Sequence, residues 1–235
     1  MPSSESWQDI AASKRKAAYG LIPEAWRLPV SMIPKPEDPV SVLNIPEKSG
    51  ILSATELDIT GKYDAVALVE KLASGELTAQ AVTTAFSKRA AIAQQLVNCI
   101  TETFFDDALE RAKYLDAYLA KEGKPIGPLH GLPISIKDSF KFKGHEATLG
   151  YVSWVGKSKA TTNSALVDLF LDLGAVIYVK TNIPQTLMTA DSDNNVFGRT
   201  LNPHNLTLNA GGSSGGEGAL VAMRGERNHH NHGQC

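Results

Sequence analysis

The first 60 residues combine one short amphipathic stretch with a run of prolines. The apolar spacing near the start predicts a short helix at Trp7–Ala18. Six prolines then fall between positions 23 and 46, and at that density they favour extended chain lying over a surface. We therefore interpret residues 1–60 as a helical and proline-rich segment that wraps over the rest of the protein.

Apolar residues then recur at helical spacing as far as position 122. Three helices are predicted there: one over about 62–74 with Thr60 as its N-cap, one over about 79–96 with Thr78 as its N-cap, and one over 106–122. Hydroxyl side chains at the two caps can accept hydrogen bonds from the free amides of the first helical turn.

The spacing of apolar residues changes to that of strands in three places. Residues 99–104 alternate between apolar and polar, 132–138 read as a strand, and 175–180 form a continuous apolar run typical of a strand buried on both faces. A helix is predicted over 164–173, just before the last strand. Helices that alternate with buried strands predict an α/β fold with a central sheet.

Composition excludes several classes of protein. The chain has 235 residues, 43% apolar and 20% charged, with a net charge of −2. This balance gives no electrostatic footprint for nucleic acid or for an anionic membrane. The longest apolar stretch is interrupted by Asp168 and Asp172, so no membrane span is predicted. The two cysteines, Cys99 and Cys235, are too few for a disulfide framework, and we expect a cytoplasmic protein.

The run from Gly211 to Gly218, with Ser213 and Ser214 inside it, is the most distinctive stretch. Glycines allow a close approach of backbone to a ligand. A phosphate-binding loop needs a lysine where Glu217 stands, and a carboxylate there would repel phosphate. A flexible linker is also disfavoured, because the apolar stretch 219–223 follows at once and predicts a buried helix.

Lys137 is the candidate base. A lysine at a strand end is most often a solvated charge at the edge of a sheet. If it is buried instead, its pKa falls and its neutral amine can act as a base beside serine hydroxyls. Either interpretation fits the residues around position 137 taken alone.

Four segments in order give the chain its resemblance. Residues 131–138 (GLPISIKD) and 211–219 (GGSSGGEGA) resemble the amidase signature family, as do the segments 181–185 (TNIPQ) and 197–203 (FGRTLNP). The likeness runs from about position 59 to 225, and the first 60 residues resemble the fungal acetamidase-type members. It implies the N-terminal part of the amidase fold, a mixed central β-sheet flanked by helices, left incomplete.

The resemblance also implies a Ser–cis-Ser–Lys triad. Lys137 matches the general base, and Ser213 matches the serine that follows a cis peptide bond and relays the proton. Ser214 is expected to give a supporting hydrogen bond at the substrate. Thr186, Leu187 and Thr189 are expected to border the acyl pocket, although the two threonines read equally well as ordinary loop hydroxyls.

The third member of the triad is expected to be absent. In the family the nucleophilic serine follows the cis serine by about two dozen residues, which places it just beyond Cys235. The amidase domain is therefore expected over 61–225, followed by a divergent polar tail over 226–235, for which an altered reading frame or a retained intron would account. His229 and His232 in this tail lie three residues apart, but in a polar tail they more often bind no metal.

The resulting prediction is an enzyme by family that hydrolyses a small linear carboxamide to a carboxylate and ammonia. No metal or cofactor is expected, and no nucleic-acid or membrane partner, while a homodimer stays open. The chain itself, without its nucleophile, is expected to be inactive. The alternatives are a non-catalytic fragment or interaction protein, and an A-type subunit of the glutaminyl-tRNA amidotransferase, which acts on charged tRNA.

Overall fold

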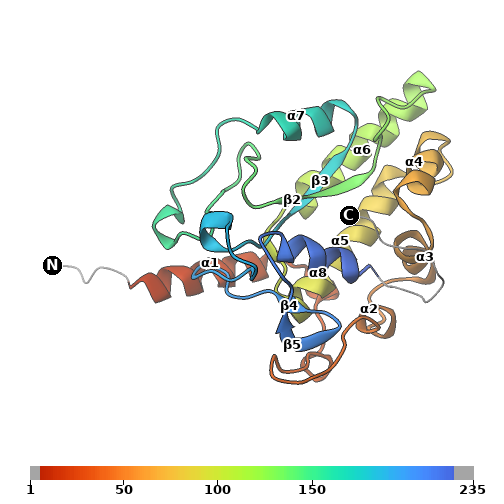
Figure 1. The fold of residues 1–235 in the computed structure, drawn as a ribbon. Coiled ribbons are helices and arrows are strands. Elements are labelled where there is room, and N and C mark those ends of the chain that lie inside the picture. The colour runs from red at the N-terminus through yellow and green to blue at the C-terminus, as the bar shows by residue number, and fades with distance from the viewer. Residues whose placement is uncertain (1–5, 225–235) are drawn as a thin grey trace.

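The structure is a computed structural model that describes residues 6–224 (Figure 1). The predicted tail over 226–235, with His229, His232 and Cys235, lies outside the described residues. The helices are α1 (Trp7–Gly20), α2 (Ile45–Lys48), α3 (Ala54–Lys62), α4 (Ala65–Ala73), α5 (Ala79–Val97), α6 (Phe105–Glu122), α7 (Ala165–Asp172) and α8 (Gly215–Ala222). The strands are β1 (Ile100–Thr103), β2 (Pro133–Lys137), β3 (Val176–Thr181), β4 (Leu201–Asn202) and β5 (Asn205–Asn209).

A mixed sheet lies at the centre of the described part, in the order β1-β3-β2. β1 runs antiparallel to β3, whereas β2 runs parallel to it. Every residue of β3 is buried, as its continuous apolar run predicted. The register pairs Lys137 at the end of β2 with Thr181 at the end of β3. The α/β class and the mixed sheet flanked by helices are thus confirmed.

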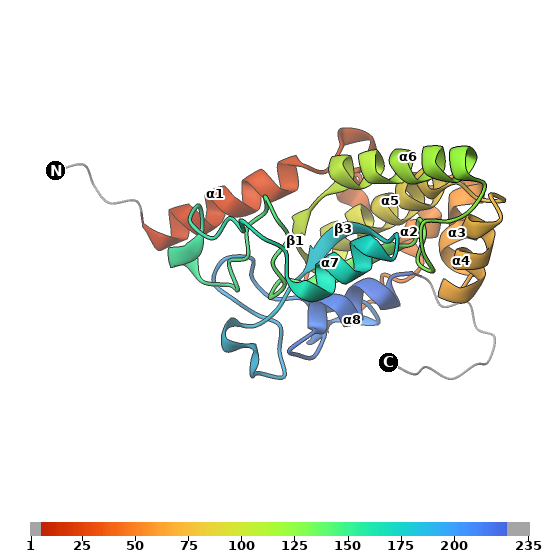
Figure 2. The same ribbon diagram turned by 90° about the horizontal axis from the view of Figure 1, so that it is seen from above.

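Helices cover both faces of this sheet (Figure 2). Tyr178 of β3 belongs to the larger core, together with residues of α5 and α6. Ile177, its neighbour, points to the opposite face and packs in a smaller cluster with Ile136 of β2 and Val167 of α7. The alternation of side chains along a strand therefore gives each helical layer its own part of the core.

The helix boundaries near residue 60 differ from the prediction. Ser53 and Glu56 form a reciprocal capping box that begins α3, a helix absent from the predicted set. Thr60 therefore lies inside α3, buried, where its hydroxyl donates to the Glu56 carbonyl at 2.8 Å. The cap of α4 is Asp64, whose carboxylate accepts from the Ala67 amide at 2.8 Å. Thr78 caps α5 as predicted.

The hairpin of β4 and β5 was also absent from the prediction. Residues of the proline-rich segment run along it: the Val42 amide donates to the Pro203 carbonyl at 2.9 Å, and the Leu206 amide donates to the Val40 carbonyl at 3.2 Å. These contacts tie the N-terminal segment to the chain that leads into the glycine run. The division of the chain at residues 60 and 225 stays a prediction.

Helix α8 begins inside the glycine run, at Gly215, four residues earlier than the predicted buried stretch. Its second residue, Gly216, lies against backbone: a Cβ there would meet the Asn182 amide nitrogen at 2.2 Å and the Cys99 carbonyl oxygen at 2.6 Å. The Gly216 amide donates to the Asn182 carbonyl at 3.1 Å. Only glycine allows this approach without a shift of the helix.

Gly216→Ala and Gly218→Ala form a matched pair on the same helix. We expect Gly216→Ala to lower the free energy of unfolding by about 3 kcal/mol, because rigid backbone atoms occupy the new methyl's space. At Gly218 the nearest such atom is 3.9 Å away, so alanine should raise it by about 0.5–1 kcal/mol through helix propensity. Urea unfolding followed by circular dichroism measures both, and equal effects would contradict the packing argument.

Candidate active site

Lys137 ends strand β2 and faces the two serines of the glycine run. Its Nζ lies 2.7 Å from the Ser213 Oγ and 3.0 Å from the Ser214 Oγ, and donates to both. The side chain is half-buried. Burial holds the pKa of the Lys137 amine below its ordinary value of 10.5. The structure therefore brings together the three residues that the sequence placed 76 and 77 positions apart.

The loop that carries Ser213 is fixed from two sides. The peptide bond between Gly212 and Ser213 is cis. Gly212 packs so closely on a neighbouring loop that a Cβ there would meet the Thr189 carbonyl oxygen at 2.3 Å. The Ser192 hydroxyl joins the two ends of the turn, because it donates to the Gly211 carbonyl at 3.1 Å and accepts from the Gly215 amide at 2.8 Å.

Asp138, the residue after Lys137, is buried and fully engaged. Its carboxylate accepts from the Thr101 hydroxyl at 2.8 Å and from the Leu149 amide at 2.9 Å. It also forms an ion pair with Lys180 of β3 at 3.3 Å. Lys180 has no exposed surface, and burial lowers its pKa although Asp138 opposes the shift. This network anchors the chain at the end of β2, next to Lys137.

A second carboxylate lies on the side of β2 that carries Lys137. Ser135 and Lys137 are two residues apart on the strand and so share a face. The Ser135 hydroxyl donates to the Glu217 carboxylate of α8 at 2.6 Å. This hydrogen bond joins α8 directly to β2, next to the contact between Lys137 and Ser213.

The predicted acyl-pocket residues lie on the loop after β3. Thr186 is exposed and Leu187 is half-buried, and both have positive φ, at 66° and 61°. Non-glycine residues in this conformation cost about 1–3 kcal/mol each and cluster at functional sites. The Thr189 hydroxyl donates to the Asp191 carbonyl at 2.9 Å, while its own carbonyl faces Gly212. The structure therefore places Thr189 beside the serine loop, and the roles of all three residues stay predictions.

Sequence reasoning missed the amide side chains that support this loop. Asn182 is buried and donates to the Gly198 carbonyl and to the Thr200 hydroxyl, each at 3.0 Å. Asn194 donates to the Asn182 side-chain oxygen at 2.8 Å. Asn182 lies in the segment 181–185 that carries part of the resemblance, but nothing in the sequence pairs it with Asn194.

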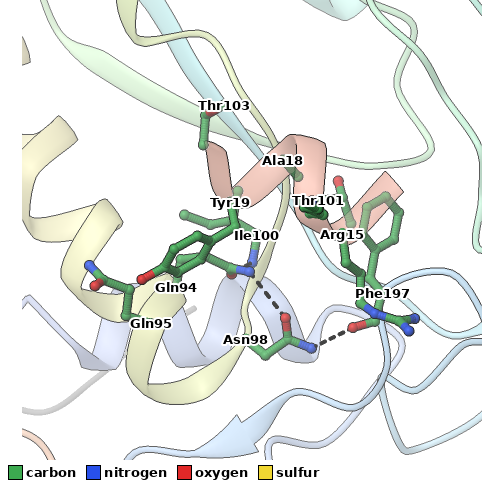
Figure 3. Close-up of a pocket in the computed structure, with 11 residues that line it drawn as sticks. Arg15, Ala18, Tyr19, Gln94, Gln95, Asn98, Ile100, Thr101, Thr103 and Phe197 are labelled. Carbon is green, nitrogen blue, oxygen red and sulfur yellow. Dashed lines mark hydrogen bonds between the residues drawn. The ribbon is translucent and has the colours of Figure 1, made fainter. Parts of the chain in front are cut away.

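A cavity of about 460 Å³ lies away from these residues, between α1, the end of α5 and β1 (Figure 3). Asn98 on its wall donates to the Phe197 carbonyl at 2.8 Å and accepts from Gln94 at 3.1 Å. Neither Lys137 nor Ser213 lines this cavity. The amide side chains of Gln94 and Asn98 pair with each other on its wall.

Two features that residues 6–224 lack bear on the class of site. Within that range no group of three or more histidine, cysteine, aspartate or glutamate side chains could hold a metal ion. None of the described helices is long and apolar enough to cross a membrane.

A lysine amine held against two hydroxyls, with a lowered pKa, is an arrangement that can accept a proton and pass it on.

Comparison with known proteins shows which family this chain resembles. The profile of the amidase family matches residues 81–227. An acetamidase of Emericella nidulans is 52% identical over 221 residues, which cover 94% of this chain and 39% of the acetamidase. An amidase of Gibberella moniliformis is 50% identical over 222 residues, covering 94% of this chain and 42% of that protein.

Solved structures agree with these relatives. A fatty acid amide hydrolase superposes with a TM-score of 0.85 at 35% identity, over 94% of this chain and 39% of the hydrolase. A bacterial aryl acylamidase matches 67% of this chain with a TM-score of 0.61 at 28% identity. This chain thus spans about two fifths of the length of the curated relatives that it matches. By profile, sequence and fold, the chain belongs to the amidase family.

Proposed function

We propose that residues 1–224 supply the general base and the proton relay of an amidase that hydrolyses small linear carboxamides to a carboxylate and ammonia. One observation carries the proposal: the Lys137 amine lies within hydrogen-bond distance of the Ser213 and Ser214 hydroxyls, at 2.7 and 3.0 Å. The substrate class is taken from the relatives named amidase and acetamidase.

The proton path follows from this geometry. A neutral Lys137 amine accepts the proton of the Ser213 hydroxyl, and Ser213 in turn takes one from the attacking nucleophile. Attack on the amide carbonyl forms a tetrahedral intermediate, and the proton taken from the nucleophile returns to the leaving nitrogen. Ammonia then departs and leaves an acyl-enzyme, which water hydrolyses to the carboxylate. The lowered pKa of Lys137 favours the neutral amine that this path needs.

The nucleophile is the part that these residues do not supply. No serine follows Ser214 in the sequence, whereas the family resemblance expects the nucleophilic serine about two dozen residues after Ser213. Ser214 has a supporting role in the proposal, as a second hydrogen-bond partner of Lys137. Thr186, Leu187 and Thr189 border the acyl group of the substrate.

The roles of base and relay can be tested in a chimera that joins residues 1–224 to the remaining part of the Emericella nidulans acetamidase. Lys137→Ala and Ser213→Ala should each lower kcat for acetamide by about 10²–10⁴-fold, the usual range for loss of acid–base catalysis. Ser214→Ala should lower it less. Lys113→Ala, on the exposed side of α6, is the control and should leave kcat unchanged. Full activity in either of the first two variants would overturn the assignment.

The pH dependence tests the state of Lys137. Because burial lowers its pKa, kcat/KM of the chimera should rise with pH through a pKa below 10.5. The folded state then binds fewer protons than the unfolded state between that pKa and 10.5, so stability should also rise with pH across this window. Lys137→Met should abolish this rise of the free energy of unfolding with pH. Urea unfolding at several pH values measures it, and an unchanged slope in Lys137→Met would contradict the prediction.

The chain by itself gives a separate test. We expect the purified 235-residue protein to release no ammonia from acetamide or benzamide, because it holds the base and relay without a nucleophile. Its circular dichroism spectrum serves as the control for folding. Ammonia release above a buffer blank, lost in Ser214→Ala, would show that Ser214 is itself the nucleophile.

A further inference from the structure

A second cavity of about 560 Å³ lies over the loop segment 139–164, which connects β2 to α7. Its walls come from the chain just after Asp138, from the short helical turn Val152–Trp154 and from residues 157–162. Neither Lys137 nor Ser213 lines it. The proposed amide hydrolysis leaves this cavity unused.

The charges around the cavity all have one sign. Lys141, Lys157 and Lys159 line it, and none of the lining residues is acidic. Glu146 is the one acidic residue in the sequence between 138 and 164, and its carboxylate pairs with Lys14 of α1 at 2.9 Å. Clefts lined by a single sign of charge concentrate ions of the opposite sign. The cavity therefore favours an anion.

Hydrogen bonds fix the main chain at these three lysines, whose side chains are exposed. The Lys141 amide donates to the Ser164 hydroxyl at 2.9 Å, and the Ser164 amide donates back to the Lys141 carbonyl at 2.9 Å. The Lys157 amide donates to the Trp154 carbonyl at 3.0 Å. Lys159 forms an antiparallel bridge with Glu146. The cationic wall is thus built on a turn and a two-stranded bridge.

Two further groups lining the cavity point to a ligand. The Ser158 hydroxyl is buried and has no hydrogen-bond partner among the described residues, although buried hydroxyls are normally paired. Trp154 is 44% exposed, and its indole is held against the Tyr151 ring with 5.3 Å between centroids. An exposed indole offers a flat apolar surface, and the hydroxyl offers a hydrogen bond.

From these observations we propose that this cavity binds a small organic carboxylate with a planar apolar body. The ammonium groups of Lys141, Lys157 and Lys159 bind its carboxylate, Trp154 packs on its apolar part and the Ser158 hydroxyl donates to an acceptor oxygen. The proposal does not rest on amide hydrolysis, because binding alone is required.

The test titrates the 235-residue chain with 4-(trifluoromethyl)benzoate and with 4-(trifluoromethyl)benzamide, followed by fluorine NMR. The two probes differ in charge and share the same ring. We expect the benzoate to bind at least fivefold more tightly at low salt, and to weaken as salt screens the lysines. The indole N–H signal of Trp154 should shift with the benzoate, while those of Trp7 and Trp26 should not.

Charge reversal locates the site. Lys157→Glu should weaken benzoate binding at least fivefold and leave benzamide binding unchanged, because the ammonium acts on the carboxylate alone. Lys113→Glu, a reversal on exposed α6, should leave both affinities unchanged and controls for net charge. Equal affinity for the two probes, or an equal loss in the two variants, would overturn the proposal.

Discussion

The candidate active site depends on one close approach of backbone to backbone, between helix α8 and the chain just after strand β3. Gly216 lies where any side chain would strike the Asn182 nitrogen and the Cys99 carbonyl. Its amide donates to Asn182, and the Asn182 amide donates to Cys99 at 2.8 Å. Helix, strand and the end of α5 are thereby locked together, and the serine loop that precedes α8 is carried to the end of β2.

Two lysines at the end of the sheet show how the surroundings of a side chain decide between a structural and a candidate catalytic role. Lys180 is fully buried and carries a counter-charge, Asp138, so it holds two strands together as part of an ion pair. Lys137 contacts hydroxyls instead, and burial alone shifts its pKa. At Lys137 no carboxylate of the described residues opposes the lowering of the pKa, whereas at Lys180 the charge of Asp138 opposes it.

Much of this arrangement could be predicted from the sequence, and the elements that were not predicted were missed for physical reasons. The strands and the long helices are marked by the period of their apolar residues, and Thr78 by its place before such a run. The capping box of Ser53 and Glu56 was present in the sequence but was overlooked, because residues 1–60 were interpreted as one wrapping segment. Thr60 was misread because a hydroxyl serves equally well inside a helix, where it bonds to the preceding turn.

The site residues divide in the same way. Lys137 and Ser213 were found because their motifs resemble a family, yet no local rule places them 2.7 Å apart. Ser192, Asn194 and Glu217 act through long-range contacts that only the folded chain reveals. Periodicity reports which face of an element is buried, and it carries no information on which polar groups meet across elements.

The buried pair of Asp138 and Lys180 also constrains how this protein can change over generations. Replacement of either residue alone leaves a single charge without its partner in the interior, which costs about 3–5 kcal/mol. A well-packed apolar pair at both positions could be neutral or even stabilising. The ion pair and an apolar pair would thus both fold well, but each single replacement between them would fold poorly. Substitutions at positions 138 and 180 are therefore expected to arise together. A compensating change at Thr101 is expected with them, because its hydroxyl would lose its acceptor.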